Sequence, residues 1–409
     1  MSAATGRDTP HREPGRTAMT VARACLVAVA FALPLSIALT EGALVLGLVA
    51  LLAARLAGRP WTFPRSWLEP ALLAVAGSWL LSTAFSPAPL ESLYHTRKLY
   101  AFGLIYLAAE AARDPAIRRR TLAALLAGGA LSAAAGYVIF GFCALTRPGY
   151  RFESILSNSM TSGGVLCAVA LWALGAAAAG GRRVTKERLA AAGALAFLLP
   201  ALALTQTRSS WLGFAAGAAV ILLALAPRAW WTLPAGFALA ALAAPAQLAA
   251  RFGSIFDPHE PGNQGRLSMW RSGLDILRDH PWVGAGCQDL LALYRRYRYP
   301  DWTFESGHFH NNFVQIAVMT GVVGSAAFLF WHAAAVRQLW RARRAATGPD
   351  RGLAAAALAV FVAMVVSGMF DFTFGDQEVI DHTYLALGLA LAILPGRAGR
   401  AGEASIGVP

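Results

Sequence analysis

Apolar runs long enough to cross a membrane constrain this chain more than any other feature of its sequence. An α-helix needs roughly 20 apolar residues to cross the hydrocarbon core of a bilayer. Runs of about that length cover residues 21–39, 42–57, 69–86, 97–112, 121–145, 160–179, 188–206, 209–226, 230–248, 310–333, 352–370 and 379–395. Lipid offers no partner for free backbone groups, so each run is predicted to be a helix. The predicted fold class is all-α, a polytopic membrane protein with about 12 transmembrane helices.

Three of these runs contain residues that are unusual inside a membrane span. Run 97–112 opens with Arg97 and Lys98, which makes it the weakest of the set. Pro34 lies in the first run and Pro200 in the seventh. Membrane helices tolerate proline because neighbouring groups satisfy the freed backbone, so both prolines are expected to be kinks.

The composition agrees with a membrane protein and argues against a soluble one. Hydrophobic residues make up 57% of the chain, charged residues make up 14%, and the mean hydropathy is +0.51. Soluble domains carry roughly 25% charged residues. The net charge of +13 could suggest nucleic acid, but the basic residues gather in particular loops, so no nucleic-acid partner is expected. The four cysteines show neither a paired framework nor a metal-type spacing.

The distribution of Lys and Arg predicts the orientation of the chain. Basic residues gather in alternate connections, such as 113–120, 182–188 and 337–351, and are rare in the short loops between them. Cytoplasmic loops carry such an excess, so both termini are predicted to lie inside. The first run lacks a convincing cleavage site and is predicted to be a retained span.

This orientation divides the chain into five parts. The predicted domains are a cytoplasmic tail at 1–20, spans one to nine at 21–248, a periplasmic loop with short helices at 249–308, spans ten to twelve at 309–395, and a cytoplasmic tail at 396–409. A structured loop as long as 249–308 is usually functional.

Basic or titratable residues stand at the predicted start of three helices on the outer side. In "TQTRSSWLGF", Arg208 directly precedes the eighth span, with Ser209 and Ser210 as natural N-caps. In "GHFHNNF", His310 and Asn311 start the tenth span. The third is a helix in the long loop.

That loop helix is predicted in "GNQGRLSMWRSGLDIL", with Arg266 at its start. Apolar residues recur along it at helical spacing and give the helix one apolar face. They are Leu267, Trp270, Leu274 and Leu277.

A helix N-terminus with an arginine beside it is suited to bind an anion. Its free N–H groups and the positive end of its dipole attract negative charge, and arginine binds phosphate in a bidentate manner. Arg208 and Arg266 together suit a diphosphate. A histidine can take up a proton near neutral pH. The combination indicates a phosphorylated substrate and a proton transfer at the outer membrane surface.

Each of these residues also has an ordinary structural interpretation, and the alternatives stay open. Arg208 could anchor a span at the interface, Arg266 could be a solvated loop residue, and His308 and His310 could be caps. The remaining candidates are Arg147 and Arg151 before span six, Glu305, and the group Asp371, Asp376, Glu378, Asp381 and His382. Glu305 could orient a histidine, and the group could line an acceptor path or be loop residues.

Several other functions lack their sequence signatures. The chain has no P-loop, no dinucleotide-binding glycine fingerprint and no strong zinc motif such as HExxH. The predicted spans hold few internal charges, which weakens an interpretation as an ion-coupled transporter.

Three of these motifs together resemble the O-antigen ligase family. His310-Asn311, nine residues, then Gly321-Val-Val-Gly324 and Ser325 resembles the family's His-Asn motif, with serine where Gly, Thr or Tyr is more usual. "TQTRSSWLG" resembles its Ser/Thr-Arg motif. "GRLSMWRSGLDILRDHPWVGAG" resembles its loop signature, in which the matching residues are Arg266, Trp270, Gly273, Pro281, Gly284 and Gly286.

The resemblance implies a glycosyltransferase with a GT-C-type helical bundle in the bacterial inner membrane and an active site on the periplasmic face. Its donor would be an O-antigen glycan on undecaprenyl diphosphate, and its acceptor a sugar hydroxyl of lipid A–core. Membrane lipids would surround it, and contact with the polymerase machinery is a further possible partner. No cofactor, ATP or metal is expected.

The residues can be given roles on this basis. Arg208 and Arg266 would stabilise the leaving diphosphate, and His310 is the candidate base. His308, Asn311, Arg271, Arg147 and Arg151 are the candidate substrate-binding residues. No covalent nucleophile is evident, so inversion at the anomeric carbon is expected.

Three alternatives share parts of this pattern. An O-antigen polymerase would use the same lipid-linked donor, but the His-Asn motif and the single long loop favour a ligase. A protein O-oligosaccharyltransferase is usually longer. A lipid-linked sugar flippase would need charges deep in the spans rather than on one side.

Overall fold

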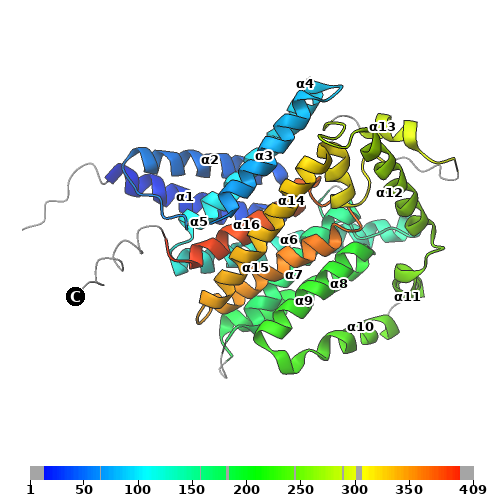
Figure 1. Ribbon diagram of the computed structural model, residues 1–409. Coiled ribbons are helices and arrows are strands. Elements are labelled where there is room, and N and C mark those ends of the chain that lie inside the picture. The colour runs from blue at the N-terminus through cyan, green and yellow to red at the C-terminus, as the bar shows by residue number, and fades with distance from the viewer. Residues whose placement is uncertain are drawn as a thin grey trace, which may run out of the picture.

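The computed structural model describes residues 13–64, 66–156, 158–180, 184–243, 246–287, 290–300 and 306–396, and within them every regular element is a helix (Figure 1). Among the described residues, eight helices are long and apolar enough to cross a membrane, which confirms the all-α, polytopic fold class. They are α1 (Glu13–Ala32), α2 (Ile37–Leu56), α6 (Pro115–Thr146), α7 (Ser159–Ala178), α8 (Lys186–Leu204), α9 (Arg208–Leu225), α14 (Asn312–Ala345) and α15 (Asp350–Ser367).

The other four predicted spans are shorter or interrupted. Two are helices of 17 residues, α3 (Leu68–Ala84) and α16 (Gln377–Ile393). The predicted span 97–112 is a 3₁₀ segment, η2 (Arg97–Phe102), followed by α5 (Gly103–Ala111) and preceded by α4 (Pro89–Thr96). The predicted span 230–248 falls on two short helices, α10 (Thr232–Ala243) and α11 (Ala246–Gly253).

The predictions for the two prolines differ in outcome. Pro200 lies inside α8, as predicted. Pro34 does not kink a span, because α1 ends at Ala32 and Pro34 lies in the turn before α2. A proline that follows a helix end cannot continue the helix, so the turn is a more favourable place for it than the interior.

Helices α7 and α16 form the centre of the bundle. Nearly every residue of both is buried, and Figure 1 shows α14, α15 and α16 crossing in front of α7. Small residues allow close approach: a side chain on Gly352 of α15 would come within 2.4 Å of the Gly175 carbonyl oxygen of α7. Membrane helices pack through such small-residue contacts, since lipid gives no hydrophobic drive for association.

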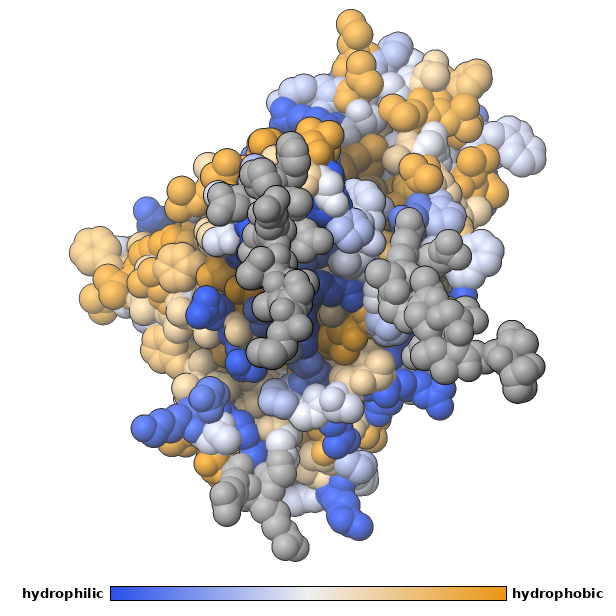
Figure 2. All heavy atoms as spheres, turned by 90° about the vertical axis from the view of Figure 1, so that its left-hand side faces the viewer, coloured by the Kyte–Doolittle hydropathy of each residue, from blue (hydrophilic) through white to orange (hydrophobic). Residues whose placement is uncertain are grey.

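The outer face of α2 is apolar although it is exposed. Leu39, Leu52 and Leu56 are 64%, 58% and 81% exposed. Figure 2 shows large apolar areas on the side where α1, α2 and α3 lie in Figure 1, with polar side chains gathered toward its lower part. An apolar surface of this extent fits contact with lipid tails.

Helix α14 is broken at Gly321, where the chain has a left-handed φ of 63°. The segment 281–286 fits against this break. Val322 N–H donates to the Pro281 carbonyl (2.8 Å), and Ala285 N–H donates to the Val318 carbonyl (2.8 Å). These bonds replace the helical bonds lost at the break. The nine residues between Asn311 and Gly321 are therefore a separate first part of α14, which has 34 residues in all.

The connection between α10 and α14 covers one end of the bundle. Its described elements are α11, η4 (Ser254–Phe256), α12 (Pro261–Asp279) and α13 (Leu290–Tyr297), and α12 lies beside the end at which α14 begins (Figure 1). The Trp270 indole donates to the Phe309 carbonyl (3.0 Å). A side chain on Gly273 would meet Val314 at 2.6 Å, so the motif glycine allows α12 to pack against α14.

Candidate active site

Arg208 is a buried cation in the first turn of α9. Its Nη1 donates to the Ser254 carbonyl (2.8 Å) and to Ser254 Oγ (3.0 Å), and its Nη2 lies 2.8 Å from Glu260 Oε2. The N-cap is Thr207, without a side-chain capping bond, so the prediction that Ser209 and Ser210 cap this helix is wrong. The helix begins one residue earlier than predicted, which moves both serines into its first turn.

Glu260 joins Arg208 to the loop helix. It is the N-cap of α12 and accepts from Asn263 N–H (2.9 Å), and its Oε1 lies 3.2 Å from Arg251 Nη1. Burial alone would raise the pKa of Glu260, but the hydrogen bond and charge of Arg208 outweigh it, and the pKa is lowered. The carboxylate is therefore charged and held between two guanidinium groups.

Arg151 lies in the loop before α7 and belongs to the same cluster of positive charge. It donates to the Thr205 carbonyl and to Thr207 Oγ1, both at 2.8 Å, directly before α9. Burial, followed by the charge of Arg251, lowers the pKa of Arg151 to about 10. Arginines normally titrate above 12, and the lowering comes mainly from burial, with smaller contributions from the positive charges of Arg251, Arg208 and Arg266. Such a cluster attracts a polyvalent anion.

Arg266 completes this arginine cluster, defined as Arg151, Arg208, Arg251 and Arg266. Its Nε donates to the Phe370 carbonyl (3.0 Å) in the turn after α15. Burial and then the charge of Arg208 lower its pKa, while Asp371 opposes this. Arg266 is the sixth residue of α12, so the prediction that it starts the loop helix is wrong, and the helix begins at Pro261 instead.

The predicted apolar face of this helix is partly exposed, with Trp270 and Leu277 half-buried. Leu267 and Leu274 are 47% and 51% exposed. The buried face carries Met269, Gly273 and Ile276 and packs against the first part of α14.

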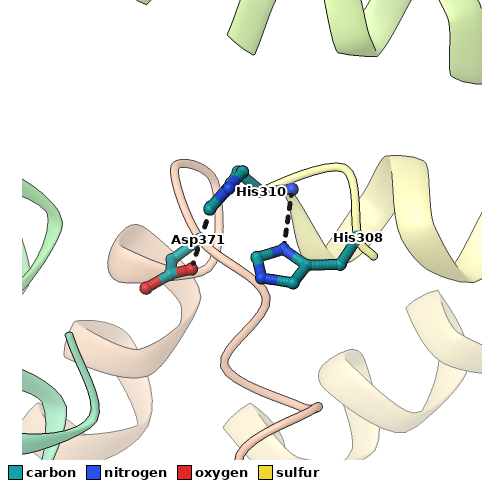
Figure 3. A group of neighbouring side chains, drawn as sticks. All are labelled: His308, His310 and Asp371. Carbon is teal, nitrogen blue, oxygen red and sulfur yellow. Dashed lines mark hydrogen bonds and ion pairs between the residues drawn. The ribbon is translucent and has the colours of Figure 1, made fainter. Parts of the chain in front are cut away.

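His310 and Asp371 form a hydrogen-bonded pair (Figure 3). Nδ1 of His310 lies 3.4 Å from Oδ1 of Asp371, and its Nε2 lies 3.4 Å from Ser306 Oγ. An ionised carboxylate only accepts, so Nδ1 carries the proton and the Nε2 lone pair is left to take another. A carboxylate in this position orients the imidazole and stabilises the imidazolium that forms.

His308 lies against His310 but is arranged differently. The two ring centroids are 4.1 Å apart, and His308 Nδ1 accepts from the backbone N–H of His310 (3.3 Å; Figure 3). Burial, then the charge of His310, lowers the pKa of His308 to about 4. His308 is therefore neutral at physiological pH, with its proton on Nε2. In this form Nε2 donates a hydrogen bond and cannot act as a base.

Asn311 and Asn312 hold the turn that carries Asp371. Asn311 caps α14 by accepting from Phe313 N–H (2.8 Å) and Val314 N–H (3.1 Å), while its amide donates to the Met369 carbonyl (3.0 Å). Asn312 N–H donates to the Gly368 carbonyl (2.6 Å). The Asn-Asn pair thereby places Asp371 beside His310.

Two residues other than glycine have left-handed φ angles in the described chain, and both lie at this site. They are Gln206 (φ 52°), two residues before Arg208, and His310 (φ 47°). Such backbone is strained for residues other than glycine and collects at functional sites. Here it positions the residues that begin α9 and α14.

The histidine–aspartate group also offers atoms to a metal. One ligand atom each from His308, His310 and Asp371 lies within 4.8 Å of the others. Two nitrogens and one oxygen are a ligand set that zinc accepts. His308 Nδ1 and His310 Nδ1 already have hydrogen-bond partners, so an ion would compete with the arrangement just described.

Some predicted site residues lie away from this group. Arg147 at the end of α6 and Arg271 on α12 are exposed, and neither side chain makes a hydrogen bond or ion pair within the described residues. Glu305 lies outside the described residues.

The sequence assigns Asp371 only to an acceptor path or a loop, and it predicts no role for Arg251 or Glu260. The only local signal for Glu260 is its position before the proline that starts a helix.

Residues 193–329 match the family model described as O-antigen ligase. This range covers about a third of the chain and contains Arg208, Arg266 and His310. The resemblance predicted from the three motifs is confirmed by this match. Arg151 and Asp371 lie outside the matched range. No curated protein matches the chain.

Proposed function

From the match of residues 193–329 to the family model described as O-antigen ligase, we propose that this chain transfers a glycan from undecaprenyl diphosphate to a sugar hydroxyl of lipid A–core. The observation that carries the proposal is the position of the His310–Asp371 pair beside the arginine cluster. A base and a diphosphate site are the two parts that such a transfer needs.

The arginine cluster supplies the site for the leaving group. Arg208 and Arg251 share one carboxylate, Glu260, in a geometry that two phosphate groups can reproduce. We propose that the donor's diphosphate displaces Glu260 from Arg208. Arg151 and Arg266 would then neutralise the charge that develops as the glycosidic C–O bond breaks.

His310 supplies the base. The acceptor hydroxyl gives its proton to Nε2 of His310 while its oxygen forms a bond to the anomeric carbon, and the bond to the diphosphate oxygen breaks. Asp371 stabilises the resulting imidazolium. The two carboxylates at the described site, Glu260 and Asp371, are already engaged by Arg208 and His310, which supports one displacement with inversion.

The proposed setting follows the predicted topology. The chain would lie in the bacterial inner membrane as a GT-C-type bundle, with the connection 249–308 as a periplasmic domain over the site. Alternation of basic and neutral loops supports this orientation. The isoprenoid donor would enter from the bilayer, and no ATP, metal or other cofactor would be required.

Transfer in vitro tests the proposal. Purified protein is mixed with undecaprenyl-diphosphate-linked glycan and rough lipopolysaccharide in the presence of EDTA and without ATP. We expect lipopolysaccharide of raised mass, lost in His310→Ala and in Arg208→Ala. Longer glycan on the carrier with no transfer to lipopolysaccharide would instead identify a polymerase, and glycan on periplasmic protein an oligosaccharyltransferase.

A further inference from the structure

A cavity of about 360 Å³ opens beside His308 and Asp371. Its walls come from α3, η2, α14 and the turn 371–376, elements that lie far apart in the sequence. The polar and aromatic groups of its lining include Trp79, His95, Lys98 and Asp376. The cavity is large enough for one or two sugar rings, since ligand pockets of a few hundred cubic ångströms hold small organic molecules.

The cavity and the arginine cluster are separate parts of the site that both reach the turn carrying Asp371. None of the four arginines belongs to the described lining of the cavity, whereas His308 and Asp371 do. Arg266 reaches the same turn from its other side, through the Phe370 carbonyl. The cavity therefore reaches the base through its two neighbours, Asp371, which is hydrogen-bonded to His310, and His308, whose ring lies against that of His310.

The groups of the cavity suit hydroxyls better than phosphates. Two carboxylates, Asp371 and Asp376, face a single lysine, and a diphosphate beside them would be repelled. Carboxylate, ammonium and indole groups match a sugar, because the first two exchange hydrogen bonds with hydroxyls and the indole covers an apolar ring face.

These groups are held in place by the surrounding structure. Lys98 Nζ donates to the Gly375 carbonyl (2.9 Å), and Asp376 Oδ2 accepts from Thr161 Oγ1 (2.8 Å). Within the described residues, Asp376 Oδ1 makes no hydrogen bond and stays available to a ligand. Trp79 is half-buried on α3. A pre-organised polar group binds with less entropic cost than a mobile one.

We propose that this cavity binds the acceptor sugar, with Asp376 and Lys98 holding its hydroxyls and Trp79 covering a face of its ring. This inference rests on the proposed function. In a single displacement the acceptor oxygen approaches the anomeric carbon from the side opposite the leaving diphosphate. We place the acceptor hydroxyl in the cavity on that side, where His308, which is part of the lining, would donate its Nε2–H to it.

The variants that test the proposal are Asp376→Asn and Trp79→Phe. Asparagine keeps an oxygen for Thr161 but removes the charge that holds hydroxyls, and phenylalanine keeps an aromatic ring. Asp257→Asn, an exposed carboxylate in the long loop, and Trp67→Phe, at the exposed start of α3, are matched controls outside the cavity lining. Neither control residue belongs to the proposed site.

Transfer is measured at varied rough lipopolysaccharide and at varied donor. We expect the KM for lipopolysaccharide to rise at least about fivefold in Asp376→Asn, the effect of losing one charged hydrogen bond, with the donor KM unchanged and the controls like wild type. A rise in the donor KM alone would overturn the proposal, because the cavity would then hold donor glycan. An unchanged KM for both substrates would also overturn it.

Binding of fluorescent rough lipopolysaccharide without donor separates this proposal from the proposed function. One outcome is that the wild-type protein transfers nothing but binds the lipopolysaccharide, and that Asp376→Asn weakens this binding. That outcome would overturn the proposed function and support the cavity assignment. Transfer by the wild-type protein with binding unaffected in both cavity variants would overturn the cavity assignment alone.

Discussion

Arg208 of α9 and Glu260 at the start of α12 form an ion pair across 52 residues, with side chains only 7% and 17% exposed. The pair ties the loop helix to the bundle, and it also occupies the guanidinium that the donor would need. Removing one partner of a buried pair leaves an uncompensated charge. Glu260 therefore stabilises the free protein, and under the proposed function it would compete with the donor's diphosphate for Arg208.

Glu260→Gln tests this competition. Glutamine has nearly the same shape but no charge to oppose the incoming phosphates, so undecaprenyl diphosphate should bind about three- to tenfold more tightly. Titration of the purified protein with undecaprenyl diphosphate measures this. Asp257→Asn, an exposed carboxylate in the same loop, should bind as wild type does. Weaker binding in Glu260→Gln would mean that the carboxylate orients Arg208 and does not compete.

Asp371→Asn tests the role of the carboxylate beside His310. The amide cannot stabilise an imidazolium and can hold the ring in the wrong tautomer. We expect kcat to fall by on the order of 10²-fold or more with little change in the KM of either substrate, and the pH profile of kcat to shift. A loss confined to KM would assign Asp371 to substrate binding alone.

His308 and His310 should respond differently to glutamine. The glutamine amide can replace the Nε2–H of neutral His308 as a donor but cannot act as a base. His308→Gln should therefore retain a measurable part of kcat, within about tenfold of wild type, the scale of one hydrogen bond, whereas His310→Gln should lose transfer. Initial rates at saturating donor and acceptor compare the two. Equal losses would contradict the assignment of the base to His310.

The framework of the fold could be predicted because run length and apolarity are local properties of the sequence. All the predicted spans fall on helical segments. The interruption at Arg97 could not be placed, since a 3₁₀ turn depends on what packs around it. The cap of α9 was misplaced for a similar reason: two serines after an arginine suggest a cap, yet Thr207 takes that position.

The candidate site could be predicted only where its residues stand in a motif. Arg208, Arg266 and His310 do, and the structure brings the first two into one charge cluster with His310 beside it. Asp371 lies 61 residues beyond His310, and no periodicity or spacing links an acid in one turn to a histidine in another. The cavity beside them could not be predicted either, because its walls come together only when α3, η2 and α14 pack in the folded protein.

Two groups, His308 and Asp376, should make the stability of the protein depend on pH in opposite directions. His308 has a pKa of about 4 because it is buried beside His310 and Arg266, so between about 4 and 6.5 the unfolded state binds a proton that the folded state does not. Stability from this group falls as pH falls through that window. Burial raises the pKa of Asp376, which lies near Asp371, Glu378 and Lys98, to about 6. The stability that the Asp376 carboxyl group contributes is therefore lost as pH rises from about 4 to 6.

Melting temperatures of the detergent-solubilised protein from pH 6.5 to 4.5 separate the two groups. Asp376→Asn removes the opposing group, so its melting temperature should fall more steeply on acidification than that of wild type. His308→Gln should fall less steeply than wild type. Identical slopes in all three proteins would show that neither group has a perturbed pKa in the folded state.

The contact between the 281–286 segment and the break in α14 gives a last prediction. Gly284 has a left-handed φ of 73°, and a side chain there would meet the Met319 carbonyl carbon at 2.4 Å. Gly284→Ala should lower the free energy of unfolding by about 2 kcal/mol or more and reduce transfer, because the same break ends the first part of α14, which begins at Asn312. Gly193→Ala, in α8 with nothing within 4 Å of the added carbon, should leave stability unchanged or slightly raised. Thermal unfolding of both variants in detergent measures the difference, and equal stability would mean that the segment does not hold the break.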